Sequence, residues 1–146
     1  MKALSKVNFI VIHCADTPSN MDVKISDLHR WHVEENGWSD IGYHYFIKRN
    51  GSLHDCRDDS LQGAHCKSVN DSSLAICIEG GFNGVNSFTT IQKKSLRALI
   101  NKLKKSHPNA AVVGHSHFDN KACPSFNVVE WYESNKDKSI FPFLLR

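Results

Sequence analysis

Residues 114–124 carry an unusual density of reactive side chains, namely His115, His117, Lys121 and Cys123. Imidazole and thiolate are the ligands that Zn²⁺ takes most readily in proteins. A single cysteine is, however, more often a small buried hydrophobe than a metal ligand. The segment therefore offers part of a possible metal site, and other elements must complete it.

Two predicted strands deliver histidines toward one place. Residues 7–14 form a continuous β-branched run that is typical of a buried strand and ends in His13 and Cys14, while residues 110–113 form a short strand just before His115. If these strands are neighbours, both imidazoles emerge at the same edge of the sheet. Because side chains alternate along a strand, only one of His13 and Cys14 can point into that site.

The spacing is consistent with a catalytic zinc centre. Cys123 follows His115 by eight positions (123 − 115). Three ligands from His13, His115 and Cys123 would leave the fourth tetrahedral position open, as in catalytic rather than structural zinc sites. His117 is an alternative to His115, which we favour because it directly follows the strand. Lys121 and Tyr43 are the candidate donors for a developing oxyanion.

Composition limits the alternatives. The 146 residues suffice for one domain, with 40% hydrophobic and 23% charged residues and a net charge of +3, which does not argue for nucleic-acid binding. Five cysteines without a C-x-x-C pair argue against a disulfide framework and for a reducing compartment. A polar N-terminus without a signal-peptide core, and no apolar run of membrane-spanning length, predict synthesis in the cytoplasm without stable membrane insertion.

Hydrophobic periodicity predicts an α/β chain. Further strands are expected at 43–48, 53–57 and 73–79, and helices at 25–36, 89–106 and 125–135. In the first helix, His29 and His32 lie three residues apart and are expected to face solvent. Alternation along the strand at 43–48 predicts that Tyr43 shares a face with Tyr45 and Ile47.

Several motifs follow one another in an order that resembles a known family. They are residues 10–14 (IVIHC), 37–44 (GWSDIGYH), 47–51 (IKRNG), 63–65 (GAH) and 121–126 (KACPSF). Together they resemble the zinc-dependent N-acetylmuramoyl-L-alanine amidases, a family that includes the peptidoglycan recognition proteins and the small phage lysozymes of amidase type. The resemblance runs from about residue 7 to 132.

This resemblance implies a single domain, which we assign to residues 1–146 with a core at about 7–135. The apolar tail at 136–146 has no counterpart in the family. The resemblance implies a central mixed β-sheet of about five strands flanked by about three helices. It implies one Zn²⁺ held by His13, His115 and Cys123, and hydrolysis by an activated water of the amide between N-acetylmuramic acid and L-alanine. Tyr43 and Lys121 match the family's catalytic pair, and substrate contacts are expected at His65, Trp38 and Arg57.

The resemblance also implies partners. Peptidoglycan is the expected substrate, reached in the cell wall after release or export of a monomeric phage or prophage endolysin. Some phage relatives also bind the RNA polymerase of their phage, and the short N-terminal arm here weakens that expectation. Ser68 and Glu79 depart from the family pattern in or near the expected groove. The apolar tail is expected to pack on the domain or to contact a partner or membrane.

Two other hypotheses remain open. One is a non-catalytic peptidoglycan-binding module on the same fold, although the presence of Cys123, Tyr43 and Lys121 favours an enzyme. The other is a Cys–His hydrolase that uses Cys14 or Cys123 as its nucleophile.

Overall fold

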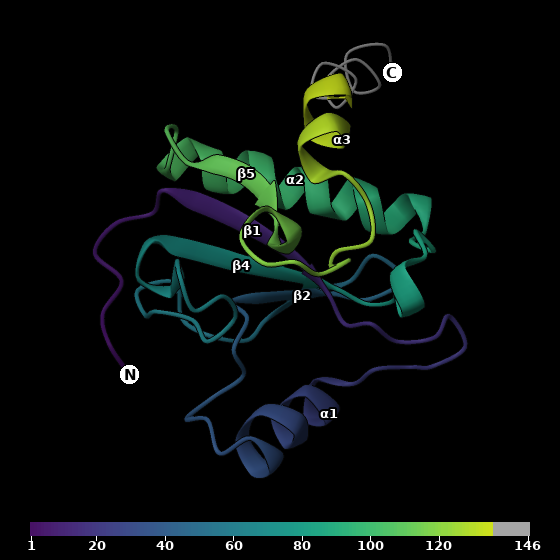
Figure 1. Ribbon diagram of the computed structural model, residues 1–146, viewed down its shortest axis with the longest axis horizontal. Coiled ribbons are helices and arrows are strands. Elements are labelled where there is room, and N and C mark those ends of the chain that lie inside the picture. Colours follow the sequence, from purple (N-terminus) through teal and green to yellow (C-terminus); the bar gives the residue numbers. More distant parts are fainter. Residues whose placement is uncertain (136–146) are drawn as a thin grey trace.

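A five-stranded mixed sheet forms the centre of the protein, whose computed structural model describes residues 1–135 (Figure 1). The strand order is β3-β2-β4-β1-β5. The strands are β1 (Phe9–Cys14), β2 (Tyr45–Ile47), β3 (Leu53–Asp55), β4 (Ser73–Ile78) and β5 (Ala111–Gly114). The four strands other than β3 run parallel, and β3 pairs antiparallel with β2 at one edge.

Helices cover both faces of this sheet (Figure 1). Helix α2 (Thr90–Ser106) and helix α3 (Val128–Asn135) lie on one side, and α1 (Ile25–His29), which continues as a π-helical segment (Arg30–Glu35), lies on the other. Short 3₁₀ turns occur at Asn70–Ser72, Phe82–Gly84 and His115–His117. The predicted mixed sheet of about five strands flanked by three helices is confirmed.

Side-chain alternation along β1 divides its residues between the two faces. Ile10, Ile12 and Cys14 enter the larger hydrophobic core, which also contains the buried stripe of α2. Val11 belongs to a separate cluster on the other face, and His13 shares that face. The strand therefore contributes its apolar residues to the core while its last imidazole remains available for a site.

Two expectations about local geometry are wrong. Strand β2 begins only at Tyr45, so the predicted alternation does not extend to Tyr43, which packs instead against the cluster that contains Phe46. His32 does not face solvent as predicted, because its side chain is buried and its Nδ1 accepts a hydrogen bond from the Gly42 N–H at 2.8 Å.

Arg97 is a charged residue of α2 that lies in the interior. It is buried, and its guanidinium lies 4.3 Å from the centre of the Trp131 ring. Its two terminal nitrogens donate to the main-chain oxygens of Trp131 and Tyr132. A charged side chain thus ties α3 to α2.

The apolar tail at 136–146 lies outside the described residues. Within residues 1–135, no helix is long and apolar enough to cross a membrane.

Glu79 joins three loop segments at the end of β4. Its carboxylate is buried and accepts hydrogen bonds from the main-chain N–H groups of Val23 (2.6 Å) and Arg49 (2.8 Å). The side chain of Gln92 donates to the Glu79 carbonyl at 2.7 Å, which adds α2 to the junction. Glu79 therefore stabilises the scaffold, although its sequence position suggested an influence on the groove.

We expect Glu79→Ala to lower the free energy of unfolding by about 2–4 kcal/mol, because two main-chain donors lose their acceptor. Glu79→Gln keeps one carbonyl oxygen and should lose about half as much. Urea denaturation of the three proteins measures this difference. Equal stability of Glu79→Ala and the parent would contradict a bracing role.

Candidate metal centre and active site

The register between β1 and β5 brings two histidines together. Ile12 pairs with Gly114, so the residues that follow, His13 and His115, stand side by side at the carboxyl edge of the sheet. Their ring centroids are 4.5 Å apart, and both side chains are buried. The prediction that the two strands are neighbours is confirmed.

Cys123 completes a three-residue group with these histidines. One ligand atom from each of His13, His115 and Cys123 lies within 4.8 Å of the other two. The Ser116 N–H donates to the Cys123 carbonyl at 2.9 Å and so returns the chain to this edge. His117, the alternative ligand, is exposed and packs on Phe118 instead.

The donor set fits Zn²⁺. Tetrahedral coordination with metal–ligand bonds of about 2.0–2.3 Å separates neighbouring ligand atoms by about 3.3–3.8 Å. The ligand atoms of the observed group, which lie within 4.8 Å of one another, are close to that spacing. Two neutral imidazoles and one thiolate would leave one coordination position open.

Asp119 adds a carboxylate beside His115 that the sequence analysis did not identify. Its Oδ2 lies 2.5 Å from His115 Nε2. Metal-binding histidines commonly donate their second ring N–H to such a carboxylate, which fixes the ring. Cys66, His115 and Asp119 also form a second group with ligand atoms within 4.8 Å, so His115 is shared by both groups.

The two cysteines near the site occupy different environments. The Cys14 side chain lies in the hydrophobic core, where its Sγ is 3.8 Å from Ser125 Oγ. A hydrogen bond with Cys123 lowers the pKa of the Cys14 thiol to about 7, whereas that bond and burial raise the pKa of Cys123. Among the described residues, the hydrogen bonds of Cys14 include no imidazole, so a Cys14–His catalytic pair is disfavoured.

His65 lies behind the metal group. Its Nδ1 is 2.8 Å from His13 Nε2, and its Nε2 is 3.0 Å from Ser73 Oγ. Both ring nitrogens are therefore engaged within the protein, which leaves only ring carbons for the substrate contact that was expected there. Nothing in the sequence pattern indicated Ser73, the first residue of β4.

A row of rings leads from the metal group toward the surface. The Tyr43 ring centroid is 5.2 Å from that of His13 and 5.3 Å from that of His32, and the Trp38 ring follows at 4.7 Å from His32. Trp38 retains 38% of its surface exposed. Burial raises the Tyr43 pKa well above its usual value, so the phenol keeps its proton and can donate.

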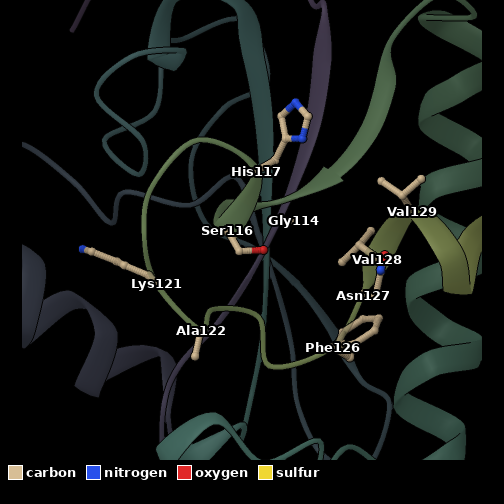
Figure 2. Close-up of a pocket in the computed structure, with 9 residues that line it drawn as sticks. All are labelled: Gly114, Ser116, His117, Lys121, Ala122, Phe126, Asn127, Val128 and Val129. Atoms are coloured by element: carbon tan, nitrogen blue, oxygen red, sulfur yellow. The ribbon is translucent and has the colours of Figure 1, made fainter.

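Lys121 stands at the boundary between this site and a neighbouring pocket. Its side chain is exposed, and its positive charge contributes to lowering the His13 pKa. Figure 2 shows Lys121 extending away from the apolar end of a pocket of about 430 Å³. That pocket is lined by residues of the 114–129 segment, namely Gly114, Ser116, His117, Lys121, Ala122, Phe126, Asn127, Val128 and Val129. This lining includes Lys121, a predicted catalytic residue, and His117, the alternative ligand.

Arg57 is buried, whereas a residue that contacts substrate in a groove is expected to be accessible. The side chain is 5% exposed, and its guanidinium donates to the main-chain oxygens of Ile41 (2.8 Å), Gln62 (2.7 Å) and Asp40 (3.0 Å). A substrate contact at Arg57 stays a prediction, and the structure shows main-chain partners for this side chain. Arg57 holds the loop before Tyr43 against the loop before His65.

The family profile described as N-acetylmuramoyl-L-alanine amidase matches residues 3–126. The chain belongs to this amidase family.

Individual relatives agree with the family assignment. The endolysin of Klebsiella phage KP32 is 37% identical over 131 residues, which cover 87% of this chain and 86% of the relative. The endolysin of Escherichia phage T7 is 34% identical and covers 92% of this chain and 91% of the relative. The solved structure of the endolysin amidase LysCS from Clostridium intestinale superposes with a TM-score of 0.75 at 26% identity, covering 87% and 84% of the two chains.

Peptidoglycan recognition proteins share the fold of this amidase-family chain. A mutant of Drosophila PGRP-LB, solved in complex with tracheal cytotoxin, superposes with a TM-score of 0.78 at 21% identity over 91% of this chain and 84% of that one. At this identity, the likeness establishes the shared fold alone.

We expect the metal-free protein to lose stability as the pH falls from 7 to 5. Burial lowers the pKa of His13, His32 and His44, and lowers that of His65 to about 3. The unfolded chain therefore binds protons below pH 6.5 that the folded chain refuses, so stability rises with pH. His65 alone should account for about 2 kcal/mol over this interval.

Urea denaturation at pH 7, 6 and 5 measures the effect. His44 is buried, and its Nδ1 accepts from the Ala75 N–H at 3.0 Å. His44→Asn keeps that acceptor and removes the titrating ring, so it should flatten the pH dependence, with the exposed His29→Asn as the control. A pH-independent free energy of unfolding would contradict the expectation.

Proposed function

We propose that this protein is a zinc-dependent N-acetylmuramoyl-L-alanine amidase that cleaves peptidoglycan between N-acetylmuramic acid and the L-alanine of the stem peptide. The observation that carries the proposal is the group formed by the buried His13 and His115 and the half-buried Cys123 at the carboxyl edge of the sheet. Family membership and similarity to phage endolysins support the same reaction. The protein would act on the cell wall as an endolysin.

His13, His115 and Cys123 would hold the metal. When bound, Zn²⁺ would supply Lewis-acid chemistry toward the scissile carbonyl and a nucleophile at neutral pH. The two imidazoles bind as neutral rings, a state that burial already favours for His13. The main-chain N–H of Cys14, 3.2 Å from the Cys123 sulfur, stabilises negative charge on that thiolate.

Tyr43 and Lys121 would assist the reaction as hydrogen-bond donors. The Tyr43 phenol remains protonated because burial raises its pKa, so it serves as a donor and not as a base. Lys121 brings a positive charge to the same edge, where it can stabilise the oxyanion that develops as the amide is attacked. The exposed ring of Trp38 continues the row of rings away from the metal group and offers a surface for the glycan or peptide.

A non-catalytic peptidoglycan-binding module is the second candidate, favoured by the structural likeness to recognition proteins. The Cys123 thiol argues against it. Binding of peptidoglycan does not require a half-buried thiol beside two imidazoles, whereas this arrangement matches the ligand types of a catalytic zinc site.

Digestion of purified peptidoglycan should release new α-amino groups of L-alanine and no new reducing sugar ends. A chelator should abolish the release, and added Zn²⁺ should restore it. Cys123→Ser is expected to lose both bound zinc, measured by elemental analysis, and activity. Cys56→Ser, which changes a cysteine outside the metal group, is the matched control.

Two outcomes would contradict this proposal. New reducing ends would indicate a glycosidase. Activity that survives the chelator and is abolished by a thiol alkylator would indicate a cysteine hydrolase.

Lys121→Ala and Tyr43→Phe should keep zinc and lose turnover by about 10²–10³-fold, the usual effect of removing one donor from an oxyanion. The exposed Lys102→Ala on α2 is the control for loss of a surface charge. Zinc content and initial rates should be measured on the same samples. Full activity in Lys121→Ala would remove this residue from the mechanism.

A further inference from the structure

A chain of hydrogen bonds runs from β4 through His65 to His13. Ser73 Oγ donates to the Val69 carbonyl at 2.6 Å, Ser73 Oγ is 3.0 Å from His65 Nε2, and His65 Nδ1 is 2.8 Å from His13 Nε2. A carbonyl oxygen can only accept, so the single hydroxyl proton of Ser73 points to Val69. The direction of every other bond in the chain follows from this fixed end.

The protons can be assigned one ring at a time. Toward His65, Ser73 presents a lone pair, so His65 Nε2 must carry the proton. In a neutral imidazole the other nitrogen is then an acceptor, so His65 Nδ1 receives the proton of His13 Nε2–H. His13 is left with one free lone pair, on Nδ1.

The reverse direction is incompatible with metal binding. If His65 donated to His13 Nε2, a neutral His13 would carry its proton on Nδ1, and neither nitrogen would have a lone pair for a metal. In that arrangement Ser73 would donate its hydroxyl proton to His65. Its oxygen would then lie 2.6 Å from the Val69 carbonyl oxygen with no proton between the two atoms, which is an unfavourable contact. The observed contact therefore selects the direction that leaves His13 able to bind a metal.

We propose that Ser73 and His65 are positioning residues that hold His13 as the Nε2–H tautomer and so reserve its Nδ1 for the metal. The proposal rests on the metal centre proposed above. It assigns His65 a role other than the expected substrate contact, and it gives a function to Ser73.

The rings of the two proposed ligands, His115 and His13, are then oriented by different kinds of hydrogen-bond partner. His115 has a partly exposed carboxylate, Asp119, at 2.5 Å from its Nε2. His13 is 2% exposed, and a carboxylate behind it would place a negative charge in the interior at a high cost. A neutral chain that ends on a main-chain carbonyl gives the same orientation without a buried charge.

The test uses the full-length protein with ¹⁵N-labelled histidine in the absence of metal. Long-range ¹H–¹⁵N correlation spectra report which nitrogen of each ring is protonated. We expect Nε2–H tautomers for both His13 and His65. A His13 ring protonated at Nδ1 would overturn the proposal, and this measurement does not depend on whether the protein cleaves peptidoglycan.

Zinc affinity, measured by competition with a chromophoric chelator, supplies the second readout. Ser73→Ala removes the fixed end of the chain and should weaken zinc binding by about 10–100-fold, the usual effect of losing an outer-shell partner. Ser73→Thr keeps the hydroxyl and should restore most of the affinity. The exposed Ser106→Ala, the same change at the end of α2, should bind zinc like the parent.

A pair of variants at His65 keeps the test decisive if Ser73→Ala does not fold. His65→Asn places an acceptor where Nδ1 stands, whereas His65→Leu has a similar volume and no acceptor. Asparagine should retain markedly more zinc affinity than leucine. Equal zinc affinity of the two folded variants would contradict the proposal.

Discussion

The constraint on which the site depends is that the buried imidazole of His13 is held in its neutral form. The His13 ring lies 4.5 Å from His115 and 4.9 Å from His65, and it is buried. Two positive rings at such distances would repel each other by several kcal/mol in a medium less polar than water. Burial and the neighbouring histidines accordingly lower the His13 pKa well below its usual value. A buried imidazole that resists protonation keeps a ring nitrogen lone pair, which a metal ion can use.

The walls of the site are loops, and buried polar side chains hold these loops in place. Arg57 donates to three main-chain carbonyls, and Glu79 accepts from two main-chain N–H groups. Gly42 permits the close approach of two of these loops, because a Cβ there would lie 2.1 Å from the Ala64 oxygen. Ionised groups that could have served the substrate are thus used for rigidity. The benefit is that Tyr43, next to Gly42, has a fixed position relative to His13 before any ligand arrives.

The outline of the fold and the proposed ligand set could be inferred from the sequence because both depend on local patterns. The run at β1 and the Thr89–Gln92 capping box of α2 are local signals, and the structure contains both. The environments of Arg57, Glu79 and His32 could not be inferred, because their partners are loop main-chain groups with no sequence signature. The role of Ser73 could not be inferred from the sequence for the same reason. Its hydroxyl has partners only in the folded chain, where the 3₁₀ turn at Asn70–Ser72 places the Val69 carbonyl beside it and another loop brings His65 within hydrogen-bonding distance.

The end of β1 shows how one strand serves two purposes. His13 points to the metal group, and the next residue, Cys14, points into the core under α2. Cys14 nevertheless contributes to the site through its main chain, because its N–H lies 3.2 Å from the Cys123 sulfur. A main-chain donor is available whatever side chain stands at that position, so the stabilisation of a Cys123 thiolate is a property of the strand end and not of the second thiol. The carboxyl edge of the sheet thus supplies two things. The His13 side chain is a proposed ligand, and the main-chain N–H of Cys14 is a fixed dipole directed at the Cys123 sulfur.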